Sequence, residues 1–375
     1  MADDTDLRHM RHALGLARRG LGTVWPNPAV GCVIVRDRRV VGRGSTRPGG
    51  RPHAEAVALA EAGEAARQAT AYVTLEPCSH HGRSPPCADA LIDAGIARVV
   101  CPLEDPDPRV EGRGFARLRA AGIVVDRCDP LVEEAVELNA GFLMHRTAGR
   151  PLVTLKIAVS IDGRIATGRG ESRWITGPAA RERVHLIRAR HDAILIGAGT
   201  ARADDPMLDV RLPGFPEDRP VRVVADGSLS LSLTGRLART ARRQPVWLFH
   251  RRDVDRARRD AWHGLGAETI VTGTTREGAL DPVAMLEALA KRGITRVLCE
   301  GGGQLAAALL RDDLVDRIVE MRAGLTLGSE GRPALGPLGI ERLANAPRFR
   351  LAAVAAVGPD TMATWLRDPQ RHSRA

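Results

Sequence analysis

Two short stretches decide the fold of the first half of this chain: HAE at residues 53–55 and EPCSHHGRSPPC at residues 76–87. The surrounding pattern places His53 at the start of a helix, Cys78 just after a strand, and Cys87 at the start of the next helix. One imidazole and two thiolates can hold tetrahedral zinc and leave a fourth position for water, whose pKa the metal lowers. Glu55 is then the spare carboxylate that moves protons.

Alone, HAE would usually mean a capping histidine, and the two cysteines would be small buried hydrophobic residues. The combination at element ends favours metal, because H-x-E followed by P-C and a further cysteine is typical of zinc deaminases. The spacing departs from that pattern in one respect, since eight residues separate Cys78 from Cys87. We therefore predict one zinc per chain, with His53, Cys78 and Cys87 as ligands and Glu55 as the catalytic acid and base.

Helical and strand patterns alternate outward from this site. We expect helices at residues 6–20, 52–66, 87–94, 114–121 and 131–143, and strands at 30–35, 71–75, 98–101 and 123–125. Such alternation predicts an α/β layered domain with helices on a mostly parallel sheet. The run AGRP at 148–151 breaks the pattern, so we place a domain of residues 1–147 before it and a domain of residues 148–375 after it.

Strand and helix patterns also alternate in the second half, although its sequence does not repeat that of the first half. Expected strands cover 152–159, 193–196, 221–225, 246–249, 296–299, 317–321, 349–357 and 362–366. Expected helices cover 178–190 and 281–292, and another follows the glycines at 301–303. This half is therefore a second α/β domain.

Composition narrows the class of protein. Hydrophobic residues make up 44% of the chain and aromatic residues 3%, so the cores must be aliphatic. No apolar run reaches the roughly 20 residues of a membrane span, and the acidic N-terminus lacks a signal-peptide pattern, so we expect a cytoplasmic protein that avoids membranes. The six cysteines do not form a disulfide framework in that compartment, and four of them should be buried: Cys32, Cys101, Cys128 and Cys299.

The net charge of +10 is unevenly shared. Residues 1–150 hold 20 arginines against 19 acidic residues, so most of the excess lies in the second half. A basic surface there could serve nucleic acid or a phosphorylated ligand, or it could be an ordinary solvated surface. The run of arginines between residues 236 and 259 fits the last of these.

Two features of the second half suggest chemistry. The chain has only two lysines among 55 basic residues, and Lys156 lies inside an apolar strand, where a compact ammonium can be needed. A snorkelling side chain is the alternative. The turn CEGGGQ at 299–304 joins a strand to a helix, and its N–H groups suit a phosphate, although it is not the dinucleotide fingerprint G-x-G-x-x-G.

Taken together, these motifs resemble the RibD-type family of bifunctional riboflavin-biosynthesis proteins. The deaminase half of that family is matched by PNPAVG at 26–31, HAE at 53–55 and the stretch 76–87. The reductase half is matched by residues 155–166, SRWIT at 172–176, residues 199–211 and EGGG at 300–303. The resemblance spans nearly the whole chain. It implies a cytidine-deaminase-like three-layer α/β domain followed by a dihydrofolate-reductase-like α/β domain that binds NADPH.

The resemblance also assigns residues, each of which could instead be an ordinary turn or surface residue. It implies that Lys156 and Asp204 are catalytic in the reductase and that Asn27 and the loop 79–84 lie near the deaminase substrate. It implies that NADPH lies near Ala158, Trp174, Thr200, Asp204, Ser228, Gly302, Gly303, Gln304, Leu305, Ala306, Ala307 and Ala308. It implies that the reductase substrate lies near Ser172, Arg188, Leu208, Arg211 and Glu300, where arginine suits a sugar phosphate.

The implied activity is deamination of a phosphorylated diaminopyrimidine followed by NADPH-dependent reduction of its ribosyl group. We expect a homo-oligomer that binds this phosphorylated pyrimidine and no nucleic acid. Two alternatives stay open: a nucleic-acid adenosine or cytidine deaminase with an accessory domain, and a binding protein with an inactive metal site. Ammonia release and a tRNA gel shift would discriminate among the three.

Overall fold

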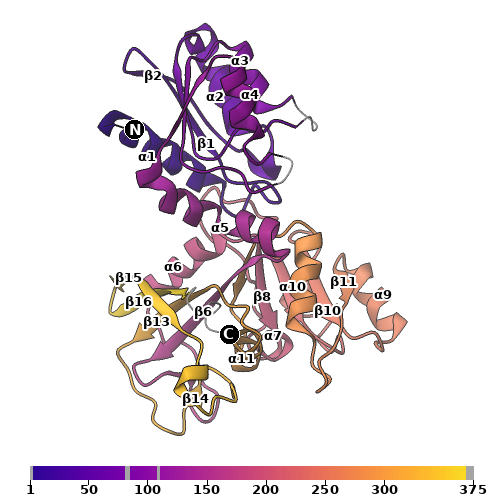
Figure 1. Ribbon diagram of the computed structural model, residues 1–375. Helices are drawn as coiled ribbons and strands as arrows, with labels where there is room; N and C mark the ends of the chain where they lie inside the picture. Colours follow the sequence, from indigo (N-terminus) through magenta and orange to yellow (C-terminus); the bar gives the residue numbers. More distant parts are fainter. Residues whose placement is uncertain (1–2, 81–84, 108–109, 369–375) are drawn as a thin grey trace. The chain divides into compact units, whose positions relative to one another are not determined.

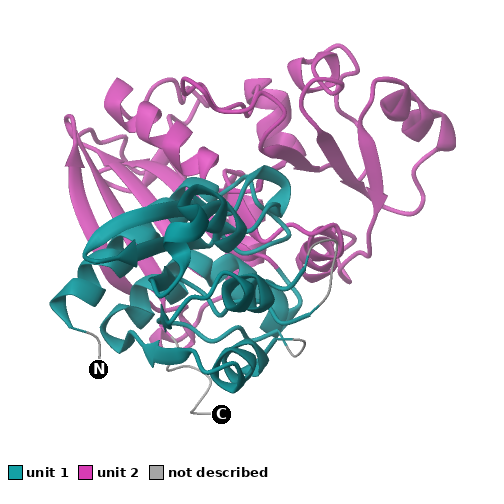
Figure 2. Ribbon diagram, turned by 90° about the horizontal axis from the view of Figure 1, so that it is seen from above, with its two compact units in different colours: residues 1–150 teal, residues 151–375 magenta. Residues whose placement is uncertain are grey.

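A computed structural model describes residues 3–80, 85–107 and 110–368. Contacts divide the chain into two compact units, Met1–Arg150 (unit 1) and Pro151–Ala375 (unit 2), which Figure 2 draws in different colours. The linker between them follows the end of helix α5 (Val132–Ala148), where Gly149 adopts a left-handed conformation that suits a helix C-terminus. Each unit has its own sheet, so each is described by itself.

Unit 1 is built on a five-stranded sheet in the order β2-β1-β3-β4-β5. The strands are β1 (Gly31–Arg36), β2 (Arg39–Ser45), β3 (Thr70–Val73), β4 (Arg98–Cys101) and β5 (Val124–Arg127). β1 pairs antiparallel with β2 and β3, whereas β3, β4 and β5 run parallel. Four of the five strands therefore run in one direction, as expected of a mostly parallel sheet, and β1 runs against them. The sequence analysis missed β2, which returns from β1 through the tight turn at Asp37 and Arg38, both with positive φ.

Helices cover both faces of this sheet, giving three layers (Figure 1). Successive residues of β1 point to opposite faces. Cys32 and Ile34 pack with α2 (Ala54–Ala62), α3 (Cys87–Asp93) and α4 (Arg113–Ala120). Val33 and Val35 pack with α1 (Asp4–Ala17) and α5. Both faces of the sheet are thus apolar and buried.

Two glycines in β2 bring α2 unusually close to the sheet. A Cβ on Gly44 would lie 2.0 Å from the carbonyl oxygen of Ala54, and one on Gly42 would lie 2.2 Å from that of Ala58. Any larger residue would push α2 away from β2. The two glycines also hid this strand from the sequence analysis, because glycine is poor in strand propensity. The helix they admit carries Glu55 in its first turn.

Unit 2 is built on a nine-stranded sheet in the order β11-β10-β9-β8-β12-β6-β13-β16-β15. The strands are β6 (Leu152–Ser160), β8 (Ala193–Gly197), β9 (Val221–Ala225), β10 (Val246–His250), β11 (Glu268–Val271), β12 (Arg296–Cys299), β13 (Arg317–Ala323), β15 (Phe349–Val357) and β16 (Asp360–Arg367). The strands from β11 to β13 run parallel, and β15 and β16 pair antiparallel at one edge. Here the expected mostly parallel sheet is confirmed.

The helices of unit 2 connect these parallel strands. They are α6 (Pro178–Ala189), α7 (Ala198–Asp204), α8 (Arg236–Arg239), α9 (Arg256–Gly264), α10 (Pro282–Lys291) and α11 (Gly303–Arg311). A small second sheet pairs β7 (Arg164–Ala166) with β14 (Arg332–Pro333). The sequence analysis missed α7, α8, α9, β7, β11 and β14, because they are short or, like the arginine-rich α9, bury little more than Trp262. The four cysteines expected to be buried are confirmed as such: Cys32, Cys101, Cys128 and Cys299.

Candidate active sites

The three predicted zinc ligands converge in unit 1. His53 precedes α2, Cys78 follows β3, and Cys87 opens α3. Their ligand atoms all lie within 4.8 Å of one another, and His53 Nδ1 lies 3.3 Å from Cys87 Sγ and 3.7 Å from Cys78 Sγ. The helix starts at Ala54, later than the sequence pattern suggested, because His53 has an extended backbone and stands at the N-cap position.

These distances fit a tetrahedral zinc ion. Bonds of about 2.3 Å to sulfur and about 2.0 Å to nitrogen place neighbouring ligand atoms about 3.5 Å apart. The backbone N–H of Cys87 also donates to Cys78 Sγ at 3.4 Å. Hydrogen bonds from Cys87 and His53 outweigh burial and lower the pKa of Cys78 to about 4, which favours the thiolate that binds metal.

Glu55 lies beside this cluster with 3% of its surface exposed. Burial and the neighbouring Cys78 raise the pKa of Glu55 to about 7, although His53 opposes the shift. A carboxyl group with a pKa near neutrality can both take up and release a proton at physiological pH, as a general acid and base requires. The position in the first turn of α2 keeps this carboxylate two residues from the ligand His53.

Glu76 stabilises the backbone around the candidate metal site, a role that the sequence analysis did not assign. Its buried carboxylate accepts hydrogen bonds from the backbone N–H groups of Asp105 at 3.2 Å, Gly112 at 3.0 Å and Phe115 at 3.1 Å. It thereby fastens the start of α4 to the segment that leads into Cys78. The sequence signal that could have indicated this role is the presence of a glutamate directly before Pro77 and Cys78.

The PNPAVG segment is held by α5. Asn139 on that helix accepts the Ala29 N–H at 3.0 Å, and Thr46 Oγ1 accepts the Val30 N–H at 3.0 Å. Asn27 packs against Gly50, where a Cβ would lie 1.8 Å from the Asn27 amide nitrogen. The loop 79–84 is described only for Ser79 and His80, so its other four positions lie outside the described residues.

A cavity in unit 2 has a volume of about 1670 Å³ and lies at the carboxyl ends of the parallel strands. Lys156 on β6, Glu300 after β12, Gly197 at the end of β8 and Ser228 after β9 all line it. Strand register aligns these ends, because Leu155 pairs with Cys299 and Cys299 pairs with Leu195. Ligands of open α/β sheets bind at such edges.

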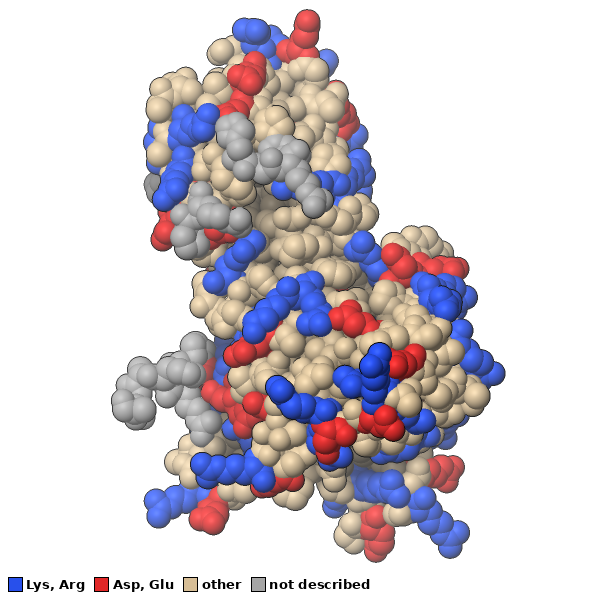
Figure 3. Space-filling model, turned by 90° about the vertical axis from the view of Figure 1, so that its right-hand side faces the viewer, with Lys and Arg blue, Asp and Glu red and all other residues tan. Residues whose placement is uncertain are grey.

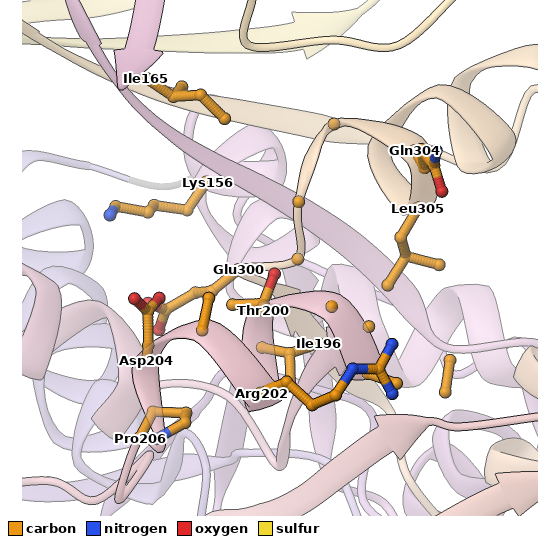
Figure 4. A pocket seen from close by; sticks show the side chains of 18 of the residues that line it. Lys156, Ile165, Ile196, Thr200, Arg202, Asp204, Pro206, Glu300, Gln304 and Leu305 are labelled. Atoms are coloured by element: carbon orange, nitrogen blue, oxygen red, sulfur yellow. The ribbon is translucent and has the colours of Figure 1, made fainter. Parts of the chain in front are cut away.

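A buried ion pair forms one wall of this cavity. Arg188 on α6 contacts Glu300 through two hydrogen bonds, Nε to Oε1 at 2.6 Å and Nη2 to Oε2 at 3.0 Å. Burial opposes ionisation of Glu300, yet Arg188 and Lys156 outweigh it and hold its pKa below the ordinary value. Burial lowers the pKa of Lys156. In Figure 4, Lys156 and Asp204 lie on the same side of the cavity as Glu300.

Three consecutive carbonyl groups in the strap Pro206–Asp209 accept side-chain hydrogen bonds. Arg188 Nη1 donates to Asp209 at 3.0 Å, Arg222 Nη1 to Met207 at 3.3 Å, and Gln244 Nε2 to Leu208 at 3.3 Å. Leu208 has a positive φ of 51°, so the strap needs this support. Arg222 is fully buried and was missed, although a cation inside an apolar strand is the signal that identified Lys156.

Nearly all the residues that the resemblance assigned to the reductase line this one cavity. They are Lys156, Ala158, Ser172, Trp174, Arg188, Thr200, Asp204, Leu208, Arg211, Ser228, Glu300, Gly302, Gly303, Gln304, Leu305, Ala307 and Ala308. Ala306 does not line it and is 1% exposed in the core, because it faces the opposite side of α11. Arg188 is already paired with Glu300, so a phosphate bound there would share the guanidinium.

The turn at the start of α11 has the form of a phosphate cradle. Gly302 is the N-cap residue and supplies no side chain to the first N–H groups of the helix. A Cβ on Gly301 would lie 2.8 Å from the Leu305 side chain and 3.4 Å from the Gly197 nitrogen, and so would fill the space above the turn. These features suit the pyrophosphate of a dinucleotide.

Charged side chains alternate in sign on the surface shown in Figure 3, where blue and red residues are interspersed. This face therefore lacks a continuous basic patch. Within the described residues, no helix has the length and apolar character that a membrane span needs.

Comparison with known proteins assigns both units. Residues 3–103 match the cytidine and deoxycytidylate deaminase zinc-binding region, and residues 151–363 match the RibD C-terminal domain. The riboflavin biosynthesis protein RibD of Escherichia coli is 44% identical over 95% of this chain and 97% of its own length. That of Haemophilus influenzae is 40% identical over 96% and 97%. The solved structure of Acinetobacter baumannii RibD has a TM-score of 0.86 at 38% identity and covers 97% of this chain and 99% of its own.

Proposed function

This chain belongs to the RibD family of riboflavin-biosynthesis proteins, and we propose that it carries out two consecutive steps, one in each unit. Unit 1 removes the 2-amino group of 2,5-diamino-6-ribosylamino-4(3H)-pyrimidinone 5′-phosphate by hydrolysis. Unit 2 then reduces the ribosyl group with NADPH, giving 5-amino-6-ribitylamino-uracil 5′-phosphate. A relative from Thermotoga maritima, 33% identical over 97% of this chain, is described as a diaminohydroxyphosphoribosylaminopyrimidine deaminase and 5-amino-6-(5-phosphoribosylamino)uracil reductase.

In unit 1, His53, Cys78 and Cys87 would hold a zinc ion. Zinc bound there supplies a water molecule of lowered pKa as the nucleophile. Glu55 takes a proton from the attacking water and delivers a proton to the leaving amine, which departs as ammonia. Its burial matches this task, because burial holds the pKa of the carboxyl group near neutrality and shields the group from bulk water. Asn27 and the segment beyond Cys78 would bind the pyrimidine.

In unit 2, the cradle before α11 would bind the NADPH pyrophosphate, and the cofactor supplies a hydride to C1′ of the sugar. Lys156 is well placed to protonate the oxygen released as the ring opens, because burial lowers its pKa and makes its proton easier to transfer. The negative charge of Glu300 raises the pKa of Lys156 and the positive charge of Arg188 lowers it, so the two effects oppose each other. Arg211 is 73% exposed in its side chain and would contact the substrate phosphate.

The convergence of three ligand atoms within 4.8 Å beside a buried carboxylate carries the deaminase assignment. A nucleic-acid deaminase, the alternative weighed above, would need a basic aromatic surface that binds single strands. Residues 1–150 instead hold 20 arginines against 19 acidic residues, and aromatic residues make up only 3% of the chain. The match of residues 151–363 to the RibD C-terminal domain further favours a second enzyme over an accessory binding module.

Glu55→Gln separates the two proposed activities. The amide preserves shape but cannot carry the proton, so ammonia release should fall by about 10²- to 10⁴-fold while zinc content stays unchanged. The same protein should reduce the already deaminated intermediate with NADPH at the wild-type rate. Ammonia release, metal analysis and NADPH absorbance measure the three quantities.

Lys156→Met is the reciprocal variant, since it should release ammonia normally and oxidise little NADPH. Circular dichroism is the control that checks whether both variants are folded. Ammonia release by Glu55→Gln within a few-fold of wild type would contradict the proton-transfer role. Loss of both activities in either well-folded variant would contradict two separate sites.

A further inference from the structure

The loop that follows β13 forms part of the wall of the unit 2 cavity. We call residues 324–337 the flap; it contains β14, and its last part, residues 332–337, lines the cavity. β14 pairs with β7, whose Ile165 lines the cavity too. In Figure 4, Ile165 lies across the cavity from Asp204 and Pro206. The flap thus belongs to a wall of the cavity to which the sequence analysis assigned no role.

The flap contacts the turn at the start of α11, which is the proposed cradle for the cofactor pyrophosphate. The Gly336 N–H donates to the Gly303 carbonyl at 2.9 Å. A Cβ on Gly303 would lie 3.1 Å from both the Ala334 carbonyl oxygen and the Gly336 nitrogen, so the two segments are closely packed. The position of the flap therefore affects the space that a cofactor has above this turn.

The flap has little apolar surface to hold it in this position. Of its residues, only Gly331 is buried. Its pairing with β7 joins Arg332 to Ala166 and Pro333 to Arg164, and the register is irregular between these pairs. A two-stranded pairing is marginally stable by itself in water. Hydrogen bonds from outside β14 are therefore needed to fix the flap.

Asp162 accepts such hydrogen bonds. It lies in the turn between β6 and β7, and its Oδ2 accepts the Gly328 N–H at 2.8 Å and the Leu327 N–H at 3.1 Å. The Ser160 hydroxyl donates to Asp162 Oδ1 at 2.5 Å and accepts the Arg164 N–H at 2.9 Å, which fixes the carboxylate on the turn. Hydrogen bonds from Ser160 and from the two flap N–H groups hold the pKa of Asp162 below its ordinary value, so the carboxylate stays ionised. Hydrogen bonds to an ionised acceptor are stronger than those between neutral groups.

We propose that Asp162 is a positioning residue of the reductase, which fastens the flap over the α11 turn and thereby sets the affinity for NADPH. Asp162 is exposed and does not line the cavity, so it acts through the flap and not by contact with a ligand. This proposal rests on the reductase function proposed above.

A graded series of variants at Asp162 tests the role of the carboxylate. Asp162→Asn retains one acceptor oxygen, and Asp162→Ala retains none. If the flap is in place only about a tenth of the time, the apparent affinity for a ligand that requires it falls about tenfold. We therefore expect KM for NADPH to rise about tenfold in Asp162→Ala and by less in Asp162→Asn, whereas kcat and KM for the pyrimidine change by less than about twofold.

Gly331→Ala displaces the flap by a different route. The added Cβ would lie 2.8 Å from Arg164 Cγ and 3.0 Å from Arg164 Cβ, so the flap must move away from β7. This variant should also raise KM for NADPH more than KM for the pyrimidine. Asp260→Asn is the matched control, because the Asp260 side chain on α9 is 61% exposed and does not line the cavity. It should keep the wild-type values.

Calorimetry with NADPH measures the same effect without turnover, and thermal unfolding checks whether each variant is folded. Wild-type affinity for NADPH in folded Asp162→Ala would overturn the positioning role. A fall in kcat with unchanged KM values, or equal rises in both KM values, would overturn it as well. Failure of the wild-type protein to bind and oxidise NADPH would overturn the reductase proposal instead.

Discussion

Replacing Gly44 by alanine should impair the deaminase and leave the reductase intact. Gly44 lies in β2, and the added Cβ would stand 2.0 Å from the Ala54 carbonyl oxygen and 2.7 Å from the Ala58 nitrogen. Both atoms belong to the backbone of α2, so no side-chain rotation can relieve the clash. Since ordinary contact begins at 3.4 Å, the helix must withdraw by about 1.4 Å, the difference between 3.4 and 2.0 Å.

That displacement directly affects the proposed zinc ligand His53, which precedes Ala54, and the proposed proton carrier Glu55, which follows it. Metal sites tolerate errors of only about 0.2 Å in ligand distance. A misplacement of about 1 Å at a reacting group can cost about 10²-fold in rate. Overpacking typically destabilises a protein by about 1–3 kcal/mol. We therefore expect ammonia release to fall about 10²-fold or more, with weaker zinc retention and a lower urea midpoint for unit 1.

The assay follows ammonia release and zinc content, with NADPH oxidation on the deaminated intermediate as the internal control. Gly15→Ala is the matched substitution, because no other heavy atom lies within 4 Å of the added Cβ and the residue is exposed on α1. It should keep full activity and gain up to about 1 kcal/mol of helix stability. Gly44→Ala protein with wild-type zinc content and ammonia release would refute the close-packing argument.

Two further predictions concern buried charges. Hydrogen bonds from Arg98 hold the pKa of Asp6 below its ordinary value. The ionised carboxylate therefore stabilises unit 1 at any pH above the unfolded-state pKa of about 3.9. This stabilisation is lost as the pH falls through the lower pKa of the folded state. Asp6→Asn should thus be less stable near pH 7 and lose less stability on acidification, and an unchanged pH dependence of the urea midpoint would contradict this. Arg222→Gln should leave buried carbonyl groups without hydrogen-bond donors and destabilise unit 2 by at least about 1–3 kcal/mol. It should also raise KM for the pyrimidine more than KM for NADPH, because Arg222 supports the strap 206–209. Thermal unfolding measures the stability effect, and steady-state NADPH oxidation measures the two KM values. Equal changes in both KM values would argue for a purely structural role of Arg222.

The sequence by itself determined the order of the two units and indicated the chemistry proposed for unit 1. His53, Glu55, Cys78 and Cys87 could be recognised because each stands at the end of an element whose local pattern is clear, and such ends meet at one edge of a sheet. Lys156 was recognisable for the same local reason, as a cation inside an apolar strand. These signals depend on neighbours in the chain, which a sequence displays directly.

Only the tertiary structure decided how those residues are held. Gly44 is only a poor strand residue in the sequence, and its role becomes visible when α2 is seen packed against it. Arg188 pairs with Glu300 across 112 positions, an arrangement that no local periodicity encodes. Side-chain direction and close packing arise from contacts between distant segments, so they become readable only once the chain is folded.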